Sequence, residues 1–359
     1  MSSPEPAAGI EARGADFLTE IREQPAALRA LLEHESSYSR VAMTARDRGA
    51  TTIRMVGHGS SDNAASYGVY AFGLLPRWTA LRDSITLTAY YDARLDMTGS
   101  TVIALSQSGR TPDVVDYVTR ARSAGAFTVA LTNDLGSDLA GAAEEVLPLA
   151  AGPERSVAAS KTYLNQIAAL GLFAGYAATE GRRLAKGIRA TADLLEDAIP
   201  ELEQQARTVA LSFASVGRMF VVGRGIGFAT AREIALKLLE TCRVAAEPLT
   251  ATALAHGPVA ALDPLFPVWT VASDDATLPA VIEAAERVRA AGATLVASGD
   301  AAEALSGAAY ALPVPKPPEP LLSPLLSVVP GQLFASALAR ARGLDADHPV
   351  GLSKVTLAR

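Results

Sequence analysis

A cluster of serine, threonine and glycine residues follows one short apolar run, in the sequence S-Q-S-G-R-T-P at 106–112. The apolar run at 102–105 is typical of a buried strand, and a strand, a short polar loop and a helix N-terminus together make an anion site. Backbone N–H groups point at the ligand in such a site, and hydroxyl groups add donors. Pro112 suits the first turn of the helix that follows. A capped turn without a ligand is the alternative interpretation of the same residues.

A second glycine-containing loop, G-H-G-S-S-D-N-A-A at 57–65, follows the apolar run at 53–56. It is similar to a dinucleotide-binding loop, but G-x-G alone is a weak signal. A dinucleotide site also needs an acidic residue at the end of the next strand. That strand ends instead in Ser106 and Gln107. The sequence therefore favours a small phosphate ester, held by both loops, over a dinucleotide.

Three charged residues share one face of the helix predicted at 230–241, because Glu233, Lys237 and Glu240 stand at positions i, i+4 and i+7. A glutamate and a lysine at this spacing most often form a surface ion pair. Glu240 is nevertheless a candidate for chemistry, because its helix follows a glycine loop at 223–227, the counterpart of the loop at 57–65.

Two further candidates are isolated in the sequence. His256 precedes a Gly-Pro pair in an apolar loop, where an acid–base role and a structural role are equally compatible with the residues. Lys354 lies close to the C-terminus between apolar residues, where a solvated tail charge is the ordinary interpretation.

Short apolar runs alternate with helical stretches along the chain, which is typical of a parallel sheet covered on both faces. Runs in the first half correspond in order to runs in the second: 53–56, 102–105, 127–131 and 146–149 to 219–222, 268–271, 294–297 and 310–313. Gly57 and Gly223 are 166 positions apart, and Ser106 and Ser273 are 167 apart. This constant register predicts a duplicated α/β unit.

Helices are predicted around and between the two halves. The connection at about 164–212 is mostly helical, with an end near Pro200. An amphipathic helix broken at Pro25 is expected at 16–33. A last helix is expected at 326–342, after a proline-rich extended loop at 315–324.

Composition excludes several classes of protein. A net charge of −6 argues against a nucleic-acid partner, and a single cysteine excludes a disulfide framework or a cysteine-rich zinc site. The four histidines are scattered, without metal-ligand spacing. We find no signal peptide and no uncharged apolar stretch of about 18 residues, so we expect a cytosolic protein that does not span a membrane.

These segments, in this order, resemble the isomerase half of glutamine–fructose-6-phosphate aminotransferase and its stand-alone SIS relatives, which include hexosamine-6-phosphate deaminases. The resemblance extends from E-I-R-E-Q-P at 20–25 to the C-terminal tail. It implies two SIS domains, each a five-stranded parallel sheet in an αβα sandwich, paired into a homodimer. We accordingly expect the following division: a flexible tail at 1–14, a sugar-phosphate-binding domain at 15–195, a catalytic domain at 196–342, and a tail at 343–359 that closes the active site.

The resemblance implies a role for each matching position. It places Glu240 as the carboxylate that moves a proton between C1 and C2, with Lys237 beside it. His256 matches a ring-opening histidine that the partner subunit donates, and Lys354 matches a tail lysine that contacts the open-chain sugar. The sugar-phosphate site is matched by Ser61, Ser106, Gln107, Ser108 and Thr111, and further substrate contacts by Gly59, Ser60, Val157, Ala158 and Ala159. No metal and no cofactor are implied.

The chain also departs from the family pattern. No glutaminase domain precedes the SIS region, so we expect that glutamine is not the nitrogen donor within this chain. Ala159 stands where the V-A-S-T-K motif of the family has a hydroxyl, and A-L-A at 253–255 stands where the synthase-like pattern has E-L-K. Arg110 replaces the usual glutamate after S-Q-S-G. The smaller residues leave room for a bulkier or uncharged C2 substituent, such as an N-acetyl group.

The sequence thus predicts an enzyme of hexosamine or hexose 6-phosphates, with isomerisation and deamination of glucosamine 6-phosphate as the leading reaction. A lyase or dehydratase that eliminates the C3 oxygen of N-acetylglucosamine 6-phosphate is the first alternative. A sugar-phosphate sensor without catalysis is the second. It is less favoured, because no basic helical domain flanks the SIS region.

Overall fold

The computed structural model describes residues 14–354, so the expected N-terminal tail lies outside the described residues except for Gly14. Two five-stranded parallel sheets make the frame, in the orders β2-β1-β3-β4-β5 and β10-β9-β8-β6-β7. Strands β6 to β10 of the second half correspond in sequence order to β1 to β5 of the first half. With this correspondence, the second sheet read from β7 to β10 has the same strand order as the first, which confirms two copies of one α/β unit. The strands are β1 Thr52–Val56, β2 Thr79–Arg82, β3 Ser100–Ser106, β4 Phe127–Thr132, β5 Glu145–Pro148, β6 Arg218–Gly223, β7 Ala245–Thr250, β8 Pro267–Val271, β9 Thr294–Gly299 and β10 Tyr310–Pro313.

All eight strands predicted from apolar runs are present, and the two that sequence reasoning missed are β2 and β7. Both form the edge of their sheet beside the first strand of their half. Edge strands are short and tolerate polar residues and proline, and β7 contains Pro248. Their residues are half-buried or exposed, apart from the buried Leu249 of β7, so neither strand shows a continuous apolar run.

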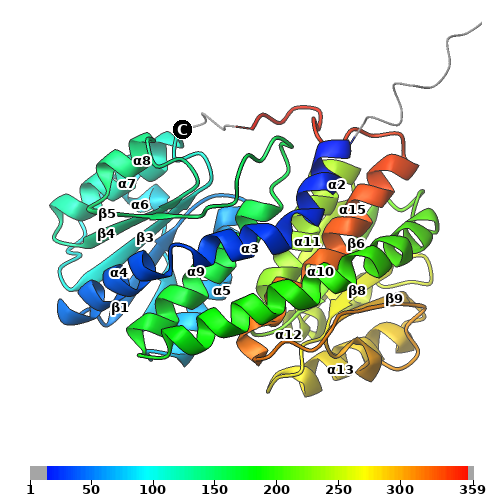
Figure 1. The fold of residues 1–359 in the computed structure, drawn as a ribbon. Helices are drawn as coiled ribbons and strands as arrows, with labels where there is room; N and C mark the ends of the chain where they lie inside the picture. The colour runs from blue at the N-terminus through cyan, green and yellow to red at the C-terminus, as the bar shows by residue number, and fades with distance from the viewer. Residues whose placement is uncertain (1–13, 355–359) are drawn as a thin grey trace, which may run out of the picture.

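The helices of each half cover both faces of its sheet (Figure 1). In the first half, α5 and α4 pack with α9 on one face, while α6, α7 and α8 group on the other. In the second half, α11 packs against α15, and α12 packs against α13. The α-helices are α2 Ala15–Arg22, α3 Gln24–Leu32, α4 Glu35–Asp47, α5 Ser60–Leu74, α6 Ile85–Ala89, α7 Pro112–Ser123, α8 Asp138–Ala142, α9 Lys161–Ala177, α10 Gly181–Leu211, α11 Gly227–Cys242, α12 Ala251–Ala255, α13 Leu278–Ala290, α14 Ser323–Ser327 and α15 Val329–Ala341.

Helix predictions succeed where caps and periodicity are clear. The break at Pro25 separates α2 from α3, and Pro112 begins α7 as expected. The expected end near Pro200 is wrong, because α10 continues from Gly181 to Leu211 with Pro200 inside it. The expected domain boundary at 195/196 falls within this helix, which runs across the front of both halves in Figure 1.

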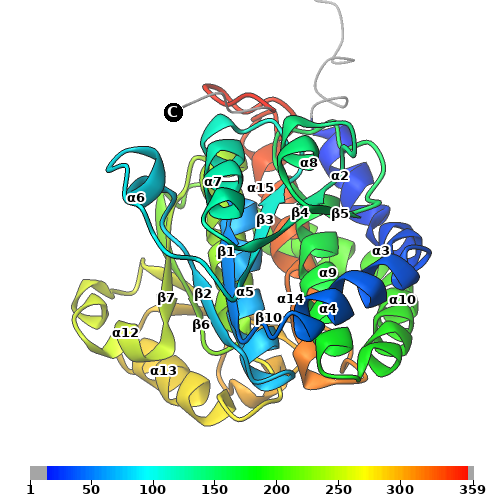
Figure 2. The ribbon, with the colours of Figure 1, turned by 90° about the vertical axis from the view of Figure 1, so that its left-hand side faces the viewer.

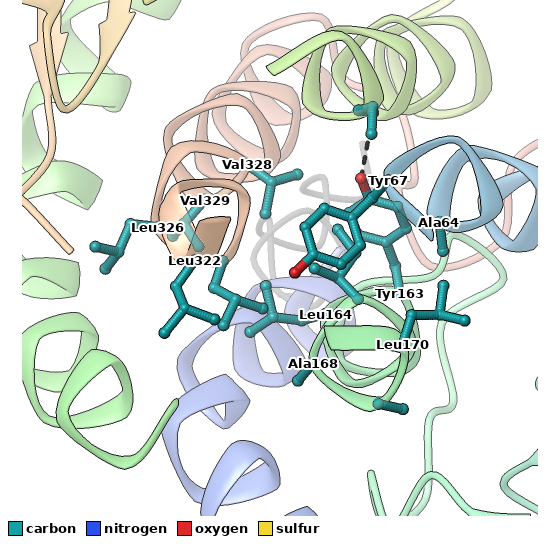
Figure 3. Close-up of a cluster of buried hydrophobic side chains, with 14 of the residues drawn as sticks. Ala64, Tyr67, Tyr163, Leu164, Ala168, Leu170, Leu322, Leu326, Val328 and Val329 are labelled. Atoms are coloured by element: carbon teal, nitrogen blue, oxygen red, sulfur yellow. Dashed lines mark hydrogen bonds between the residues drawn. The ribbon is translucent and has the colours of Figure 1, made fainter. Parts of the chain in front are cut away.

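One continuous hydrophobic core joins the inner faces of the two sheets. Alternate residues of each central strand contribute to it: Ile103 and Leu105 from β3, and Trp269 and Val271 from β8. Figure 3 shows Tyr67 and Tyr163 between the helices of this layer. The Tyr163 hydroxyl donates a hydrogen bond to the Ala229 carbonyl at the start of α11 (3.2 Å). The two halves therefore share a core.

The expectation that no long apolar stretch exists is wrong. The helical segment Pro320–Ala341 is long and apolar enough to cross a membrane, with a mean hydropathy of 1.6. It is also 94% buried inside the protein, where its side chains pack between the two sheets. A helix that is apolar on all sides is either a membrane span or a core helix, and this burial is that of a core helix. The extended loop expected at 315–324 is confirmed only in part: residues 315–319 form neither helix nor strand, but the helical segment already begins at Pro320.

The contact between α15 and α11 yields a prediction on stability. A Cβ atom at Gly331 of α15 would lie 2.3 Å from Cγ1 of Ile234 on α11, so Gly331→Ala forces the two helices apart. We expect the free energy of unfolding to fall by about 1–3 kcal/mol, measured by urea denaturation. Gly141→Ala is the matched control, because nothing lies within 4 Å of a Cβ at that helical position. Equal stability of the two variants would contradict this packing.

Candidate active site

A cavity of about 560 Å³ lies where the loops after β1 and β3 meet. From these adjacent strands the chain leaves in opposite directions, to the edge strand β2 and to β4. Ligands of open α/β sheets bind at the carboxyl ends of strands at such a switch point. The cavity also receives residues of α11 and of the C-terminal segment, which lies over α7 at the top of Figure 2. It is therefore built by both halves of the chain.

The loop at 106–111 forms one wall, with Ser106, Gln107, Ser108 and Thr111 all lining the cavity. Two of its hydroxyls shape the turn: Ser106 Oγ accepts a hydrogen bond from the Gly109 backbone N–H (3.1 Å), and Ser108 Oγ accepts one from the Arg110 N–H (3.3 Å). Thr111 is the N-cap of α7. The wall thus combines hydroxyls with a helix N-terminus, a combination that suits an anion.

Gly109 fixes the shape of this loop. Its φ is +62°, in the left-handed region that favours glycine. A Cβ atom there would lie 2.0 Å from Ser137 Oγ, so a larger residue would displace the start of α8. The glycine of the S-Q-S-G pattern is thus required by conformation and by space.

The loop after β1 supplies the neighbouring wall. Gly59, Ser60 and Ser61 line the cavity at the N-terminus of α5. Ser61 Oγ accepts a hydrogen bond from Gln166 Nε2 of α9 (2.8 Å), and both residues are buried. The Ser61 hydroxyl is thereby held in place, with its own proton available to a ligand.

The charged residues of α11 are buried, so their interpretation as a surface ion pair is wrong. The side chains of Lys237 and Glu233 are 1% and 0% exposed, whereas Glu240 is 22% exposed and lines the cavity with Lys237. Lys237 Nζ lies 2.6 Å from Glu240 Oε2 and 3.4 Å from Glu233 Oε1. Ser60 and Asn63 of α5 each donate a hydrogen bond of 2.8 Å to Glu233. We call Glu233, Lys237 and Glu240 the α11 cluster.

The α11 cluster holds its lysine in the charged form. Burial lowers the pKa of Lys237, but Glu233 and Glu240 outweigh burial and raise this pKa well above its usual value. Burial raises the pKa of Glu233, which Lys237 only partly offsets. A permanent ammonium group therefore stands beside Glu240 at the cavity wall.

A second buried carboxylate holds the C-terminal segment. Glu154 Oε2 lies 2.9 Å from Lys354 Nζ, which also donates to the Ser156 carbonyl (2.7 Å). Burial alone would raise the pKa of Glu154, yet Lys354 and the backbone N–H groups of Ser160 and Thr162 keep this pKa below its usual value. Lys354 lines the cavity, so its interpretation as a solvated tail charge is wrong.

The cavity brings together most of the predicted site residues, but not all of them. Val157 and Ala159 line it, and Ala159 presents only a methyl group there. Ala158 is buried in the core cluster beside them and does not line the cavity. His256 is exposed at the C-cap of α12 and lies outside the cavity of its own chain. The C-terminal segment reaches the cavity with Leu352, Ser353 and Lys354, while 355–359 lie outside the described residues.

Sequence reasoning missed several cavity residues. Thr162 and Gln166 are buried polar residues of helix α9, and polar residues at core positions are a usable signal of function. His58 lies in the first glycine loop and contacts Asp113 of α7. Glu154 stands in an irregular segment without periodicity, so no sequence pattern indicated its burial. Within 14–354, no cluster of three or more His, Cys, Asp or Glu residues could hold a metal ion.

Comparisons with known proteins agree with this architecture. A family model described as "SIS domain" matches twice, at residues 48–175 and 212–341. Glutamine–fructose-6-phosphate aminotransferase [isomerizing] from Pyrococcus horikoshii is 33% identical over 354 residues, which is 94% of this chain and 57% of that protein. The Aeropyrum pernix enzyme of the same name is 34% identical over 94% of this chain and 56% of that protein. The chain thus spans little more than half the length of these curated relatives.

Solved structures show the same fold. The crystal structure of a proposed phosphosugar isomerase from Silicibacter pomeroyi is 32% identical, covers 92% of this chain and 99% of its own, and has a TM-score of 0.81. The C-terminal domain of glucosamine-fructose-6-phosphate aminotransferase from Francisella tularensis has a TM-score of 0.86 at 22% identity, over 94% of this chain and 99% of its own. Glucosamine-6-phosphate deaminase from Thermotoga maritima has a TM-score of 0.76 at 19% identity, over 96% of this chain and 100% of its own. The last two likenesses concern the fold alone.

The α11 cluster yields a prediction on stability. Lys237→Met leaves two carboxylates without their buried cation, so we expect the free energy of unfolding to fall by about 3–5 kcal/mol in urea denaturation. The double variant Glu233→Gln/Lys237→Met should regain part of this loss, because one uncompensated charge is then removed. Arg287→Met, at the exposed Glu283–Arg287 pair of α13, is the matched control and should change stability by less than about 0.5 kcal/mol. A similarly small effect of Lys237→Met would contradict the buried arrangement.

Proposed function

The chain belongs to the family of proteins with SIS domains, present here in two copies, and from this premise we propose that it is an isomerase and deaminase of glucosamine 6-phosphate. The relatives support the coarser part of the statement, a sugar-phosphate enzyme of the isomerase type. The position of Glu240 supports the specific reaction, isomerisation and deamination. Its carboxylate faces the same cavity as the loop at 106–111, which we call the hydroxyl loop, with a permanent cation beside it.

The phosphate group of the substrate binds at the hydroxyl loop and the N-terminus of α5. Ser61, Ser106, Ser108 and Thr111 offer hydroxyls there, and Gln107 offers an amide. The lysines that line the cavity are already paired with carboxylates, so the phosphate is held mainly by neutral donors and helix N-termini. Binding energy at this end positions the sugar carbons against the opposite wall.

At that wall, Glu240 takes the proton from C2 of the open-chain sugar. Lys237 or Lys354 stabilises the negative charge that develops on the oxygen at C1. Glu240 then returns the proton to C1, which leaves an imine at C2. Water hydrolyses the imine, so that ammonia leaves and fructose 6-phosphate remains. One carboxylate thus serves as base and then as acid.

Ring opening requires an acid–base group near O5, and we propose His256 for this step. Because His256 lies outside the cavity of its own chain, the proposal requires a homodimer in which the partner subunit donates it. Its exposure at the end of α12 leaves it accessible to a second chain.

A second candidate is elimination of the C3 oxygen from N-acetylglucosamine 6-phosphate. An acetylated nitrogen blocks the loss of ammonia, and the same C2 proton abstraction then leads to β-elimination. Ala159 favours it, because the cavity wall carries a methyl group where the related motif has a hydroxyl. Ala253 and Ala255 do not support it within one chain, since both lie on α12 away from the cavity. A sensor without catalysis is less favoured, because it has no use for the α11 cluster at the cavity wall.

A substrate panel distinguishes the reactions. The protein is incubated separately with glucosamine 6-phosphate, N-acetylglucosamine 6-phosphate and fructose 6-phosphate, and the products are analysed by mass spectrometry. Release of ammonia from the first supports the deaminase. A product lighter by one water from the second supports the lyase. Turnover of none of the three overturns the assignment as an enzyme of these sugars.

Glu240→Gln tests the proton transfer itself. The amide cannot accept the C2 proton, so we expect the rate of turnover to fall by at least about a thousandfold. Binding of the phosphate ester, followed by calorimetry, should change little. Glu283→Gln, on the exposed face of α13, is the matched control and should keep the wild-type rate. A Glu240→Gln enzyme with the wild-type rate would show that another group takes the proton.

A further inference from the structure

A histidine joins the two loops that line the phosphate end of the cavity. His58 Nε2 lies 2.8 Å from Asp113 Oδ2, and both residues line the cavity. His58 stands between two glycines after β1, whereas Asp113 is in the first turn of α7, directly after the hydroxyl loop. The imidazole is 56% exposed and the carboxylate 10%. An anion at the hydroxyl loop would therefore lie close to this pair.

Asp113 alone would oppose such an anion. Its second oxygen, Oδ1, is buried and makes no hydrogen bond among the described residues. A buried carboxylate repels a neighbouring phosphate strongly, because little solvent screens the two charges. A protonated His58 paired with Oδ2 offsets this negative charge beside the proposed phosphate site.

The other charged groups around the cavity have ion-pair partners of their own. Lys237 is paired within the α11 cluster, and Lys354 is paired with Glu154. Arg110 is 61% exposed and pairs with Asp134. Of the described residues that line the cavity, His58 is the only histidine, and histidine is the residue type that most often acts as a pH-dependent switch in proteins.

We propose that His58 and Asp113 form an ionisable pair that sets the affinity of the cavity for the phosphate group, strong when His58 is protonated and weak when it is neutral. This inference rests on the proposed function, because it takes a sugar phosphate as the ligand. The protonated imidazole neutralises Asp113 and adds a positive charge beside the phosphate. The neutral imidazole leaves the carboxylate charge uncompensated, so the enzyme releases phosphate esters more readily as pH rises.

The test measures binding without turnover. Glucitol 6-phosphate has no carbonyl group and cannot be isomerised, so its dissociation constant is measured by calorimetry from pH 5.5 to 8.5. The phosphate group itself titrates near pH 6, but its ionisation cancels when variants are compared at the same pH. The comparison is the ratio of the dissociation constants of His58→Asn and wild type. His34→Asn, at the junction of α3 and α4 outside the cavity, is the control and should give a ratio of about one at every pH.

We expect the dissociation constant of His58→Asn to be about ten times that of wild type at pH 5.5, and the two constants to become nearly equal at pH 8.5. His58→Arg keeps a charge at all these pH values, so it should bind more tightly than wild type at pH 8.5. Asp113→Asn removes the repelling charge and should also bind at least as tightly as wild type at pH 8.5. A merely structural bond between the two side chains would instead make Asp113→Asn weaker at every pH.

The outcomes separate this inference from the proposed function. If wild type binds glucitol 6-phosphate but the His58→Asn ratio is the same at every pH, the ionisable pair is wrong while the phosphate site stands. If the two proteins bind glucitol without phosphate with the same pH-dependent ratio of dissociation constants, the pair does not act on the phosphate. This result would also overturn the proposed role of the pair. If wild type binds no phosphate ester at any pH, both the inference and the proposed function fail.

Discussion

The burial of Lys237 between two carboxylates is the constraint on which the arrangement of this molecule depends. A charged triad inside a protein is tolerated only when the remaining donors and acceptors are satisfied. Ser60 and Asn63 of α5 satisfy the oxygens of Glu233, and both belong to the other half of the chain. Helix α11 must therefore dock against α5. The docking that buries Lys237 also brings Glu240 to the wall of the cavity.

The same docking makes the two copies of one fold unequal. The loops after β1 and β3 open into the cavity, with glycine, serine and threonine at the strand ends. At the corresponding place in the second half, Asp274 pairs with Lys316, and Asp275 accepts a hydrogen bond from the Thr277 hydroxyl. In the second half, carboxylates and their partners thus occupy the place that corresponds to the loop after β3. The second half contributes to the cavity of the first half through α11 and the C-terminal segment instead.

Much of this fold could be predicted from the sequence, because buried parallel strands are continuous apolar runs and the duplication repeats their spacing. The edge strands β2 and β7 could not, since their mixed burial leaves no such run. The hydroxyl loop was predictable for a local reason: strand end, glycine and helix start are adjacent in the sequence. Burial of Lys237 and Glu154 was not, because Ser60 of α5, which contacts Lys237, and Lys354 of the C-terminal segment, which pairs with Glu154, lie far away along the chain. The spacing of Glu233 and Lys237 alone fits a solvated face equally well.

The central claim is that a carboxylate supplied by the second half moves a proton on a sugar held by the first. Glucosamine 6-phosphate with deuterium at C2 tests it most directly, with the label followed by NMR during incubation with wild type and with Glu240→Gln. The account predicts that wild type moves the deuterium from C2 to C1 or exchanges it with water, while Glu240→Gln leaves it at C2. Loss of the label from C2 at the same rate in both proteins would contradict it.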